Sequence, residues 1–434
     1  MSSLYNLPKN WKWATLGEIT DTTSGGTPKR TNKDYWNGSI NWLKSGELND
    51  GYIYDVEETI TEEGLKKSSA KIFKTGTLLM AMYGATVGRL GILKVDTSTN
   101  QAVCAIFNRF NLFNNEYIFF YLKYTRQQML EDSFGGAQPN LSQGYINNIN
   151  IPFAPFNEQK RIVTKIEKLF SNLDKSDQHL VHLEKQLKRY RQSILKSTFE
   201  NEKAENWVTL ENIFEIERGG SPRPIKNFLT DADDGINWIK IGDTKVGQKY
   251  IEFTKEKIKP EGLKKSRLVI EGDFILSNSM SFGRPYIMKT TGAIHDGWLV
   301  FREKMDNINK DYFYYLLSSA YMYQQFSVKA SGSTVKNLNK ELVKTIKVPL
   351  PTETEQANIV KQIEKHFSII DKLEAVVQKS IKESKRLRQS ILKQAFEGKL
   401  VEQDPSDESA TILLEKITKA KEEYKKEMKK GKKK

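Results

Sequence analysis

The stretch that decides the fold reads Asn157-Glu158-Gln159-Lys160-Arg161-Ile162-Val163-Thr164-Lys165-Ile166-Glu167-Lys168-Leu169-Phe170-Ser171 and opens a helical pattern that continues to Glu200. The same text returns 197 residues later, where Glu158-Gln159 recurs as Glu355-Gln356. The pattern closes on Arg189 to Lys196, which recurs with one change as Arg386 to Lys393. An internal repeat of this size determines the architecture and is therefore interpreted first.

Both copies predict a long helix, because their apolar residues alternate between spacings of three and four, as in a coiled-coil seam. Each helix should run for roughly 43 residues, or about 64 Å at 1.5 Å per residue. Asn157 and Thr354 are candidate N-caps, and Gly398 is a candidate C-terminal stop. Two separate core helices are the alternative, but the length and the seam favour packing of one helix on the other. The predicted seam consists of Ile162, Ile166, Leu169, Leu173, Leu180, Leu183, Leu187, Tyr190, Ile194, Ile359, Ile363, Phe367, Ile370, Leu373, Val377, Ile381, Leu387 and Ile391.

The repeat extends upstream of the helices. Trp13-Ala14-Thr15-Leu16 returns as Trp207-Val208-Thr209-Leu210, and Gly25-Gly26-Thr27-Pro28 returns as Gly219-Gly220-Ser221-Pro222. Between these motifs, short β-branched or aromatic runs such as 71–73, 77–80 and 102–107 predict strands, separated by Gly, Pro, Asn and Asp clusters. Residues 115–129 and 310–325 predict helices with aromatic faces. The expected fold is therefore α+β, with a module of globular domain plus long helix used twice.

The predicted boundaries follow from this duplication. They are a first globular domain at 1–155, a central long helix at 156–203, a second globular domain at 204–352, a C-terminal long helix at 353–403 and a Lys/Glu-rich tail at 404–434. Within the tail, Ala410 to Lys430 predicts a marginal helix. The terminal lysines are interpreted as a solvated end, with phosphate contact or partner docking as alternatives.

Composition limits the class of protein. The formal net charge is +14, and half of that excess lies from Lys416 onward, which raises nucleic-acid binding as a possibility. Cys104 is the single cysteine, so no intrachain disulfide or cysteine-based metal cluster can form, and a reducing cytoplasm is expected. The chain has no signal-peptide pattern, and no apolar run approaches the roughly 20 residues of a membrane span, so no membrane partner is predicted.

Catalytic and metal-binding constellations are not predicted. The sequence has no GxGxxG dinucleotide motif, no GxxxxGK[ST] phosphate loop and no Asn-Pro-Pro or Asp-Pro-Pro run of an amino-methyltransferase. His179 and His182 lie one helical turn apart but lack a third ligand nearby. His295-Asp296 could pair a base with its orienting group, but the first copy has Gln101-Ala102 at that place.

Glycine beside a cation recurs instead. The segments 25–30, 84–89, 133–138, 218–223, 281–284 and 329–336 combine turn residues with Arg, Lys or Gln. Glycine lets backbone N–H groups approach phosphates, and Arg or Gln can read base edges in the major groove. Each loop alone could be an ordinary hairpin, but correspondence between the copies favours a shared binding role. Trp42 and Trp238 are expected in the core. The predicted DNA-binding residues are Gly25, Gly26, Lys29, Arg30, Arg89, Gln138, Arg218, Gly219, Gly220, Arg223, Arg284, Lys329 and Lys336.

Up to about residue 400 the chain resembles the specificity (S) subunit of type I restriction-modification systems. The resemblance is carried by the order and duplication of short motifs rather than by any one of them. These motifs are Gly-Gly-Thr-Pro and Gly-Gly-Ser-Pro, Ile-Asn-Trp at 40–42 and 236–238, Asn100-Gln101-Ala102, Pro152 and Pro349 ahead of a helix opened by Glu-Gln, and Arg-Gln-Ser-Ile-Leu-Lys at 191–196 and 388–393.

This resemblance implies two target recognition domains, each of which reads one half of a bipartite double-stranded DNA target. It also implies that the long helices pair antiparallel and set the distance between the domains, in a pseudo-two-fold arrangement. Modification subunits would methylate adenine at N6, and restriction subunits would translocate and cleave. S-adenosylmethionine, ATP and Mg²⁺ would bind only those partners, so this chain would need no cofactor and perform no catalysis.

The two copies differ where Ile294-His295-Asp296 stands in place of Asn100-Gln101-Ala102, which predicts an asymmetric target. The alternative is a degenerate or decoy scaffold, which would bind partner subunits through its helix pair without reading DNA.

Overall fold

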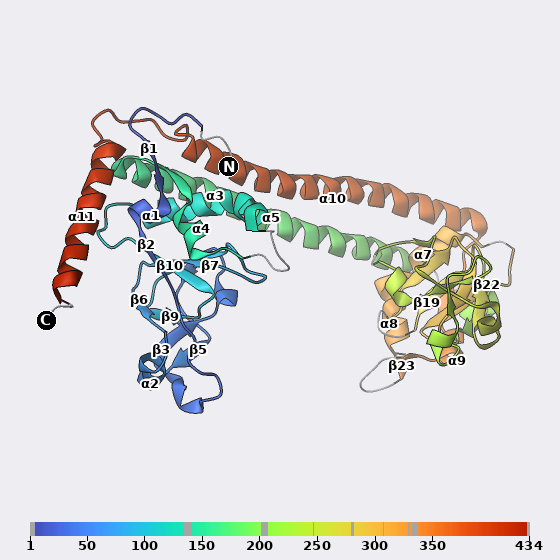
Figure 1. Cartoon of the computed structure of the whole chain (residues 1–434). Helices are drawn as coiled ribbons and strands as arrows, with labels where there is room; N and C mark the ends of the chain where they lie inside the picture. Colours follow the sequence, from blue (N-terminus) through green and yellow to red (C-terminus); the bar gives the residue numbers. More distant parts are fainter. Residues whose placement is uncertain are drawn as a thin grey trace. The chain divides into compact units, whose positions relative to one another are not determined.

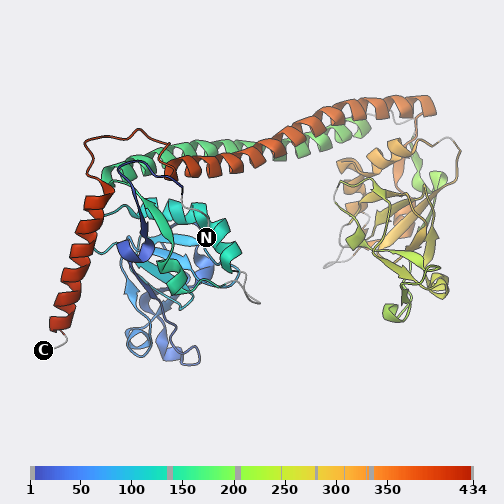
Figure 2. The same cartoon turned by 45° about the horizontal axis from the view of Figure 1, so that its top comes forward.

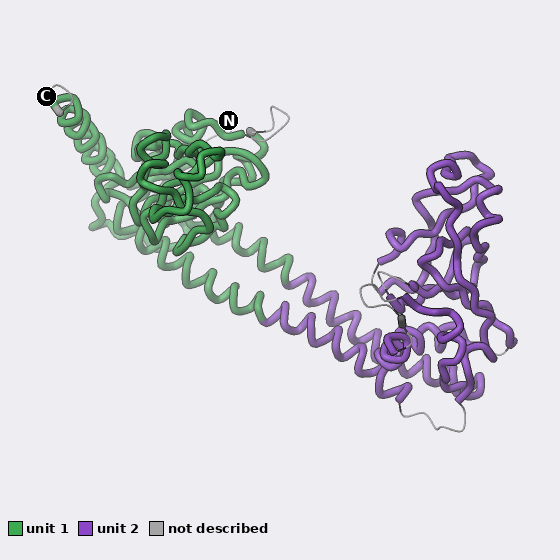
Figure 3. Tube along the Cα trace, turned by 90° about the horizontal axis from the view of Figure 1, so that it is seen from below, with its two compact units in different colours: residues 1–178, 381–434 green, residues 179–380 purple. Residues whose placement is uncertain are grey.

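The computed structural model describes residues 5–133, 140–200, 207–245, 247–278, 282–306, 308–328, 330–331 and 337–431 (Figure 1). The chain divides into two compact units, unit 1 (Met1–Gln178 with Ile381–Lys434) and unit 2 (His179–Ser380), shown in separate colours in Figure 3. Each unit contains one globular domain and one half of each long helix.

Unit 1 carries a small two-stranded sheet and two larger mixed sheets. Their strand orders are β1-β11, β2-β10-β7-β8-β4 and β5-β3-β9-β6, and the pairs β4–β8 and β3–β9 are parallel. In chain order the elements are β1 (Lys12–Thr15), α1 (Leu16–Ile19), β2 (Asp21–Ser24), η1 (Lys33–Tyr35), β3 (Trp36–Leu43), η2 (Ser45–Glu47), β4 (Gly51–Ile53), β5 (Glu58–Ile60), α2 (Glu62–Lys66), β6 (Ile72–Phe73), β7 (Leu78–Ala81), β8 (Leu90–Leu93), β9 (Thr97–Thr99), β10 (Val103–Phe107), α3 (Asn115–Ser133), α4 (Gln143–Asn147) and β11 (Asn150–Phe153).

The central strands of unit 1 are buried on both faces. In β7, Leu78 and Met80 point into the core that contains α3, whereas Leu79 and Ala81 point into a second core against the other large sheet. Successive side chains of a strand point to opposite faces, so a short apolar run without polar alternation is what a doubly covered strand requires. This explains why these runs predicted strands correctly.

Unit 2 repeats the plan. Its orders β12-β25, β13-β22-β19-β20-β16 and β14-β17-β15-β21-β18 correspond to those of unit 1, with β14 as an added edge strand and β23-β24 as an added two-stranded sheet. In chain order the elements are β12 (Trp207–Thr209), α6 (Leu210–Ile213), β13 (Phe214–Arg218), η4 (Ile225–Asn227), β14 (Leu229–Thr230), β15 (Ile236–Ile239), η5 (Ile241–Asp243), β16 (Tyr250–Ile251), β17 (Glu256–Ile258), η6 (Pro260–Lys265), β18 (Arg267–Val269), β19 (Phe274–Ser277), β20 (Pro285–Met288), β21 (Gly292–Ile294), β22 (Trp298–Glu303), α7 (Lys310–Leu317), α8 (Ala320–Val328), β23 (Ala330–Ser331), β24 (Asn337–Leu338), α9 (Lys340–Lys344) and β25 (Lys347–Pro349).

The predicted helices of the globular domains form, with one correction. Residues 115–129 lie in one helix, α3, but the expected single helix at 310–325 is broken into α7 and α8. The break falls at Ser319, whose buried hydroxyl donates to the carbonyl of Leu316 at 2.6 Å and accepts from the amide of Met322. A serine that bonds local backbone in this way caps a new helix instead of continuing the old one.

The long helices are α5 (Phe156–Glu200) and α10 (Glu353–Phe396). The predicted N-caps Asn157 and Thr354 are wrong, because both residues lie inside the helices. Thr352 caps α10 instead, and its amide and hydroxyl both bond Glu355 in a capping box. Gly398 ends α10 as predicted: it has a φ of +70°, and Lys399 donates to the carbonyl of Gln394 at 2.8 Å, as in a Schellman motif.

The Glu-Gln pair that opens each helix has a structural role. The amide group of Gln159 donates to the carbonyl of Ala154 and accepts from the backbone of Asn114. Gln356 repeats both bonds with Pro351 and Asn309. Each glutamine is almost completely buried and ties the start of a long helix to the loop that precedes the main helix of its globular domain.

The Lys/Glu-rich tail folds as α11 (Ala410–Gly431), which lies against the side of the globular domain in unit 1 (Figures 1 and 2). The helix was predicted, but its packing was not. Ala410, Leu413 and Ile417 are buried in the main core of unit 1, and this tertiary contact stabilises a helix that its own sequence leaves marginal.

Candidate nucleic-acid interface

The glycine pairs hold the two large sheets of each domain together. In unit 1, the amide of Gly25 donates to the carbonyl of Val103 at 3.1 Å and that of Gly26 to Thr99 at 2.8 Å. In unit 2, Gly219 and Gly220 donate in the same way to Trp298 at 2.9 Å and to Ile294 at 3.1 Å.

A side chain at any of these four glycines would overlap a neighbouring backbone; a Cβ on Gly220, for example, would lie 2.5 Å from the carbonyl oxygen of Lys265. The expected phosphate contact through these amides is therefore corrected: they are already bonded within the domain, and glycine is needed for close packing. What the glycine pairs can do for binding is to fix the segments that follow them.

Arg30 follows the first glycine pair and is itself held in place. Its guanidinium lies 3.8 Å from the ring centre of Trp36 and 4.7 Å from that of Trp42, and it pairs with Glu58. Arg30 and Lys44 together hold the pKa of Glu58 below its usual value, so this carboxylate stays charged. Trp42 is buried, as predicted, and donates its indole N–H to the carbonyl of Gly26 at 3.0 Å.

Lys29 and Arg89 are exposed, like Arg30, but differ from it in their partners. Neither forms an ion pair with another residue that the structure describes. Arg89 stands at the turn between β7 and β8, directly after Gly88, which has a φ of +75°. Arg126 of α3 fixes this turn, because it donates to the carbonyl of Gly88 at 2.8 Å and to Asp50 at 2.7 Å.

Unit 2 gathers its corresponding cations around Asp296. Arg223 lies 3.5 Å from the Asp296 carboxylate, and Arg218 donates to the Asp296 carbonyl at 3.1 Å. The hydroxyl of Ser221 donates to the same carboxylate at 2.7 Å and, with His295 and Arg223, holds the pKa of Asp296 below its usual value. The sequence comparison of the two copies placed Ala102 here, and the structure corrects this. Thr99 accepts from Gly26 as Ile294 accepts from Gly220, so the equivalent of Asp296 in unit 1 is Gln101, which contacts Thr27 as Asp296 contacts Ser221.

His295, beside that carboxylate, is positioned by packing. Burial lowers its pKa, so the imidazole is neutral near pH 7. Its Nδ1 accepts from the amide of Gly297 at 2.8 Å, and its ring centroid lies 6.2 Å from that of Trp238 and 6.2 Å from that of Trp298. Trp238 is buried, as predicted.

Arg284 corresponds to Arg89 and is also exposed. It lines a groove of about 1330 Å³ in unit 2, between the globular domain and the halves of α5 and α10 that belong to this unit. Four tyrosines, Tyr286, Tyr314, Tyr315 and Tyr323, form part of the groove wall. The predicted residues Gln138, Lys329 and Lys336 lie outside the described residues.

No metal centre is found in the part of the chain that the structure describes, where no group of three or more His, Cys, Asp or Glu side chains could hold an ion. No helix among those residues is long and apolar enough to cross a membrane.

The helix seam differs from the prediction at four of its positions, which belong to a second row of contacts along the helices. Fourteen predicted residues are buried or half-buried, and they are Ile162, Ile166, Leu169, Leu173, Leu180, Leu187, Ile194, Ile359, Ile363, Phe367, Ile370, Val377, Ile381 and Ile391. Leu183, Tyr190, Leu373 and Leu387 are instead exposed, by 38%, 53%, 44% and 49%. The positions one residue further along are the half-buried ones, and they are Glu184, Arg191, Glu374 and Arg388. An apolar pattern could not reveal a row that is filled by charged side chains.

Those charged residues form two equivalent sets of ion pairs between the helices. In each set, called a clamp below, one arginine contacts two carboxylates of the other helix. In unit 2, Arg191 of α5 contacts Asp371 at 2.5 Å and Glu374 at 3.3 Å, and its guanidinium lies 4.5 Å from the ring centre of Phe367. In unit 1, the equivalent Arg388 of α10 contacts Asp174 and Asp177 of α5 at 2.8 Å each and lies 5.2 Å from Phe170. The helices therefore pack antiparallel in both units, with the same contacts.

Comparison with known proteins agrees with this duplicated architecture. A sequence model of the type I restriction modification DNA specificity domain matches residues 8–185 and again residues 204–383. The StySPI specificity subunit of Salmonella potsdam is 24% identical, over 95% of this chain and 95% of its own length. The EcoKI specificity subunit of Escherichia coli K12 has the same identity and coverage. The MjaIX specificity subunit of Methanocaldococcus jannaschii is 32% identical, and that match spans 36% of this chain and 37% of the relative.

Two solved structures share the fold. A chain from a type I R-M system assembly superposes with a TM-score of 0.73 at 20% identity, covering 92% of this chain and 100% of that chain. The HsdS subunit from Thermoanaerobacter tengcongensis gives a TM-score of 0.55 at 20% identity and covers 91% of this chain and 99% of its own.

Proposed function

Because this chain belongs to the type I restriction-modification DNA specificity family, we propose that it reads a two-part, asymmetric double-stranded DNA sequence, one half with each globular domain. Family membership makes the chain a DNA-recognition component without catalytic activity. The observation that carries the two-part reading is the duplication itself: the same sheets and glycine contacts present different cations, Lys29 and Arg89 in one unit and Arg218, Arg223 and Arg284 in the other.

The acceptor–donor group in unit 2 supports different half-sites. Arginine pairs best with guanine, whereas a carboxylate accepts from the amino group of cytosine. Asp296 brings a carboxylate among arginines at a place where unit 1 has the neutral amide of Gln101. Two domains of the same fold that present such different side chains to DNA would select different bases. The target would therefore be asymmetric.

The helix pair would act as a spacer between the two readers. Both helices are continuous over 45 and 44 residues, and each unit clamps its own halves with one arginine and two carboxylates. In paired helices, polar residues within the seam specify the register, and charged pairs beside it set the orientation. A fixed register is what a spacer requires.

Modification subunits would dock on the exposed side of the helix pair. In unit 2, Ile369, Leu373 and Val376 of α10 are exposed by 52%, 44% and 59%, and their spacing of four and three residues places them on one helix face. An exposed apolar stripe of this kind marks a protein contact. Restriction subunits would join the assembly, and S-adenosylmethionine, ATP and Mg²⁺ would act only on these partners, which methylate adenine at N6 or cleave. We place this assembly in the cytoplasm, with the DNA.

Selection from random DNA tests the proposed function. The chain is mixed with modification subunits and a pool of random duplexes, and bound DNA is sequenced at several salt concentrations. We expect one two-part sequence, bound more weakly as salt rises. Retention of modification subunits without any enriched sequence would instead make the chain a scaffold that reads no DNA, an alternative that none of the comparisons supports.

A further inference from the structure

Helix α11 is an addition to the duplicated plan. The helix that ends the first module, α5, is followed directly by the second globular domain, whereas α10 is followed by α11. Figures 1 and 2 both show α11 running along the side of the globular domain in unit 1. An appended helix that is folded against one domain only can give that domain a contact that the other lacks.

The first half of α11 is firmly anchored. Leu413 and Ile417 are exposed by only 3% and 1%, and the amide of Ala410 donates to the carbonyl of Asn10 at 2.9 Å. Just before the helix, Asp407 pairs with Arg161 of α5 at 2.6 Å. These contacts bury apolar surface and join the helix to the N-terminal segment and to α5.

Lys421 and Tyr424 extend this anchor to the middle of the helix. The ammonium group of Lys421 donates to the carbonyls of Gly17 and Thr20 at 2.8 Å each, so it caps the C-terminal end of α1. The ring of Tyr424 lies 4.4 Å from the guanidinium of Arg109. The position and direction of α11 relative to its domain are therefore fixed as far as Tyr424.

Beyond Tyr424 the helix is strongly basic. Lys425, Lys426, Lys429 and Lys430 are exposed, against a single acidic residue, Glu427. None of the four lysines forms an ion pair with another described residue.

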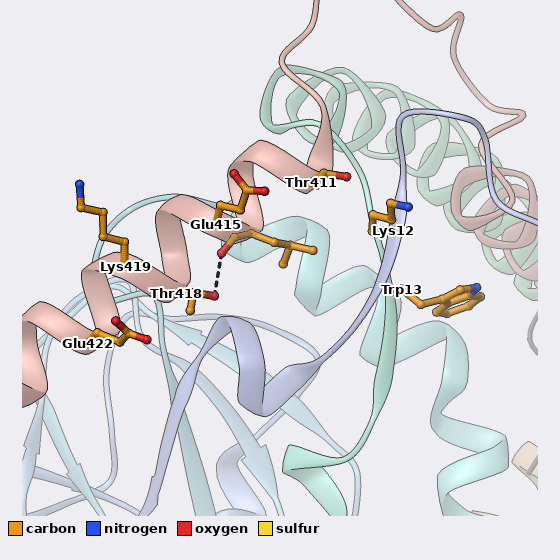
Figure 4. Close-up of a pocket in the computed structure, with 8 residues that line it drawn as sticks. Lys12, Trp13, Thr411, Glu415, Thr418, Lys419 and Glu422 are labelled. Atoms are coloured by element: carbon orange, nitrogen blue, oxygen red, sulfur yellow. Dashed lines mark hydrogen bonds between the residues drawn. The ribbon is translucent and has the colours of Figure 1, made fainter.

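The first half of the helix differs. A groove of about 490 Å³ between β1 and α11 is lined there by two lysines, Lys12 and Lys419, and two glutamates, Glu415 and Glu422 (Figure 4). The charge of that surface is balanced, so the unbalanced charge of α11 is confined to its last two turns.

We propose that these last turns contact the DNA phosphate backbone outside the half-site read by unit 1, an inference that rests on the proposed function. Lysine is a compact point charge that suits sequence-independent phosphate contact, and each neutralised phosphate releases counterions. Among these turns only Met428, exposed by 49%, offers apolar surface, which is too little for a protein interface. An anchored basic helix on one domain lengthens the DNA contact on that side alone.

Two matched variants of the full chain test this inference, each assembled with modification subunits on the DNA that the wild-type assembly selects. K425Q/K426Q/K429Q/K430Q removes the charge, and K425R/K426R/K429R/K430R keeps it. We expect the slope of log affinity against log salt to fall in magnitude by about 0.9 for each lost phosphate contact in the glutamine variant only. Hydroxyl-radical footprinting should lose protection at one outer flank, with the selected sequence unchanged.

The other outcomes are equally decisive. An unchanged slope and footprint in the glutamine variant would overturn the inference while the proposed function stands. Loss of modification-subunit binding with an intact DNA slope would also overturn it, because the lysines would then serve a protein partner. If the wild-type assembly selects no sequence, the proposed function itself fails. Ending the chain after Tyr424 provides a second variant, since the anchoring contacts remain, and it should reproduce the loss of slope and flank protection.

Discussion

Arg388 on α10 donates to Asp177 on α5 at 2.8 Å, and the duplicated partner of this contact joins Arg191 on α5 to Glu374 on α10. The same pairing thus occurs twice, with the roles of the helices exchanged. Equivalent residues of the two copies lie on antiparallel helices, so the contact is a direct product of the internal repeat.

Removing one clamp should weaken the helix pair. Because Arg388 is 22% exposed and its partners more so, Arg388→Met should lower the free energy of unfolding by about 1 kcal/mol. Chemical denaturation of the full chain measures this, and Arg386→Met, a change at an exposed neighbour, is the control. Equal effects of both changes would contradict a specific role for the clamp.

The contribution of the Arg388–Asp177 ion pair to the free energy of unfolding should also depend on pH, in a direction that the pKa of Asp177 determines. Partial burial of Asp177 would raise its pKa, but Arg388 and Ser384 hold it below the usual value. A carboxyl group whose pKa is lowered by folding stabilises the folded state at pH values above its unfolded-state pKa of about 3.9. This contribution is lost as the pH falls through the pKa of the folded state. The difference in unfolding free energy between the wild type and Asp177→Asn should therefore be present at pH 7 and vanish in acid. A difference that grows in acid would contradict the assignment.

Substitutions at the glycine pairs should act mainly on the stability of the fold and not directly on DNA binding. Gly220→Ala forces a Cβ against the Lys265 carbonyl and should cost about 1–3 kcal/mol of folding free energy, as overpacking does. Gly242→Ala is the matched control, because nothing lies within 4 Å of its added Cβ. Thermal unfolding separates the two variants. If the Gly220→Ala chain had wild-type stability but bound DNA poorly, the hypothesis of a direct phosphate contact, excluded above, would have to be reinstated.

Exposed cations should act on one half-site each. Arg89→Gln should weaken binding by about 1–3 kcal/mol through the half-site of unit 1, and Arg284→Gln by a similar amount through that of unit 2. Competition between duplexes mutated in one half-site or the other measures this, with Arg386→Gln as a control outside both globular domains. A variant that leaves affinity and selectivity unchanged removes its residue from the interface.

The sequence predicts the architecture well because the features that set it are repeated and apolar. Doubly buried runs such as 102–107 predicted strands, and Gly398 marked the end of α10. The second row of the seam escaped prediction because Arg191 and Arg388 are charged, and hydrophobic periodicity cannot detect ion pairs between distant segments.

The role of the glycines was missed for a related reason. A Gly-Gly pair is compatible with an open phosphate loop and with two sheets in close contact, and only the bonds from Gly25 to Val103 and from Gly219 to Trp298 distinguish these cases. The docking of α11 depends on Lys421 reaching carbonyls about 400 residues away, a contact that no local pattern encodes.

Methylation mapping tests most directly whether the helix pair sets the spacing between two sequence readers, as we propose. Four residues are inserted into each long helix, after Gln178 in α5 and after Ser380 in α10, which lengthens the pair by about 6 Å or roughly two base pairs. Methylated adenines are then mapped genome-wide in cells that carry the chain with its modification subunits. We expect both half-site sequences to be unchanged and the gap between them to widen. Altered half-sites with an unchanged gap would contradict the account.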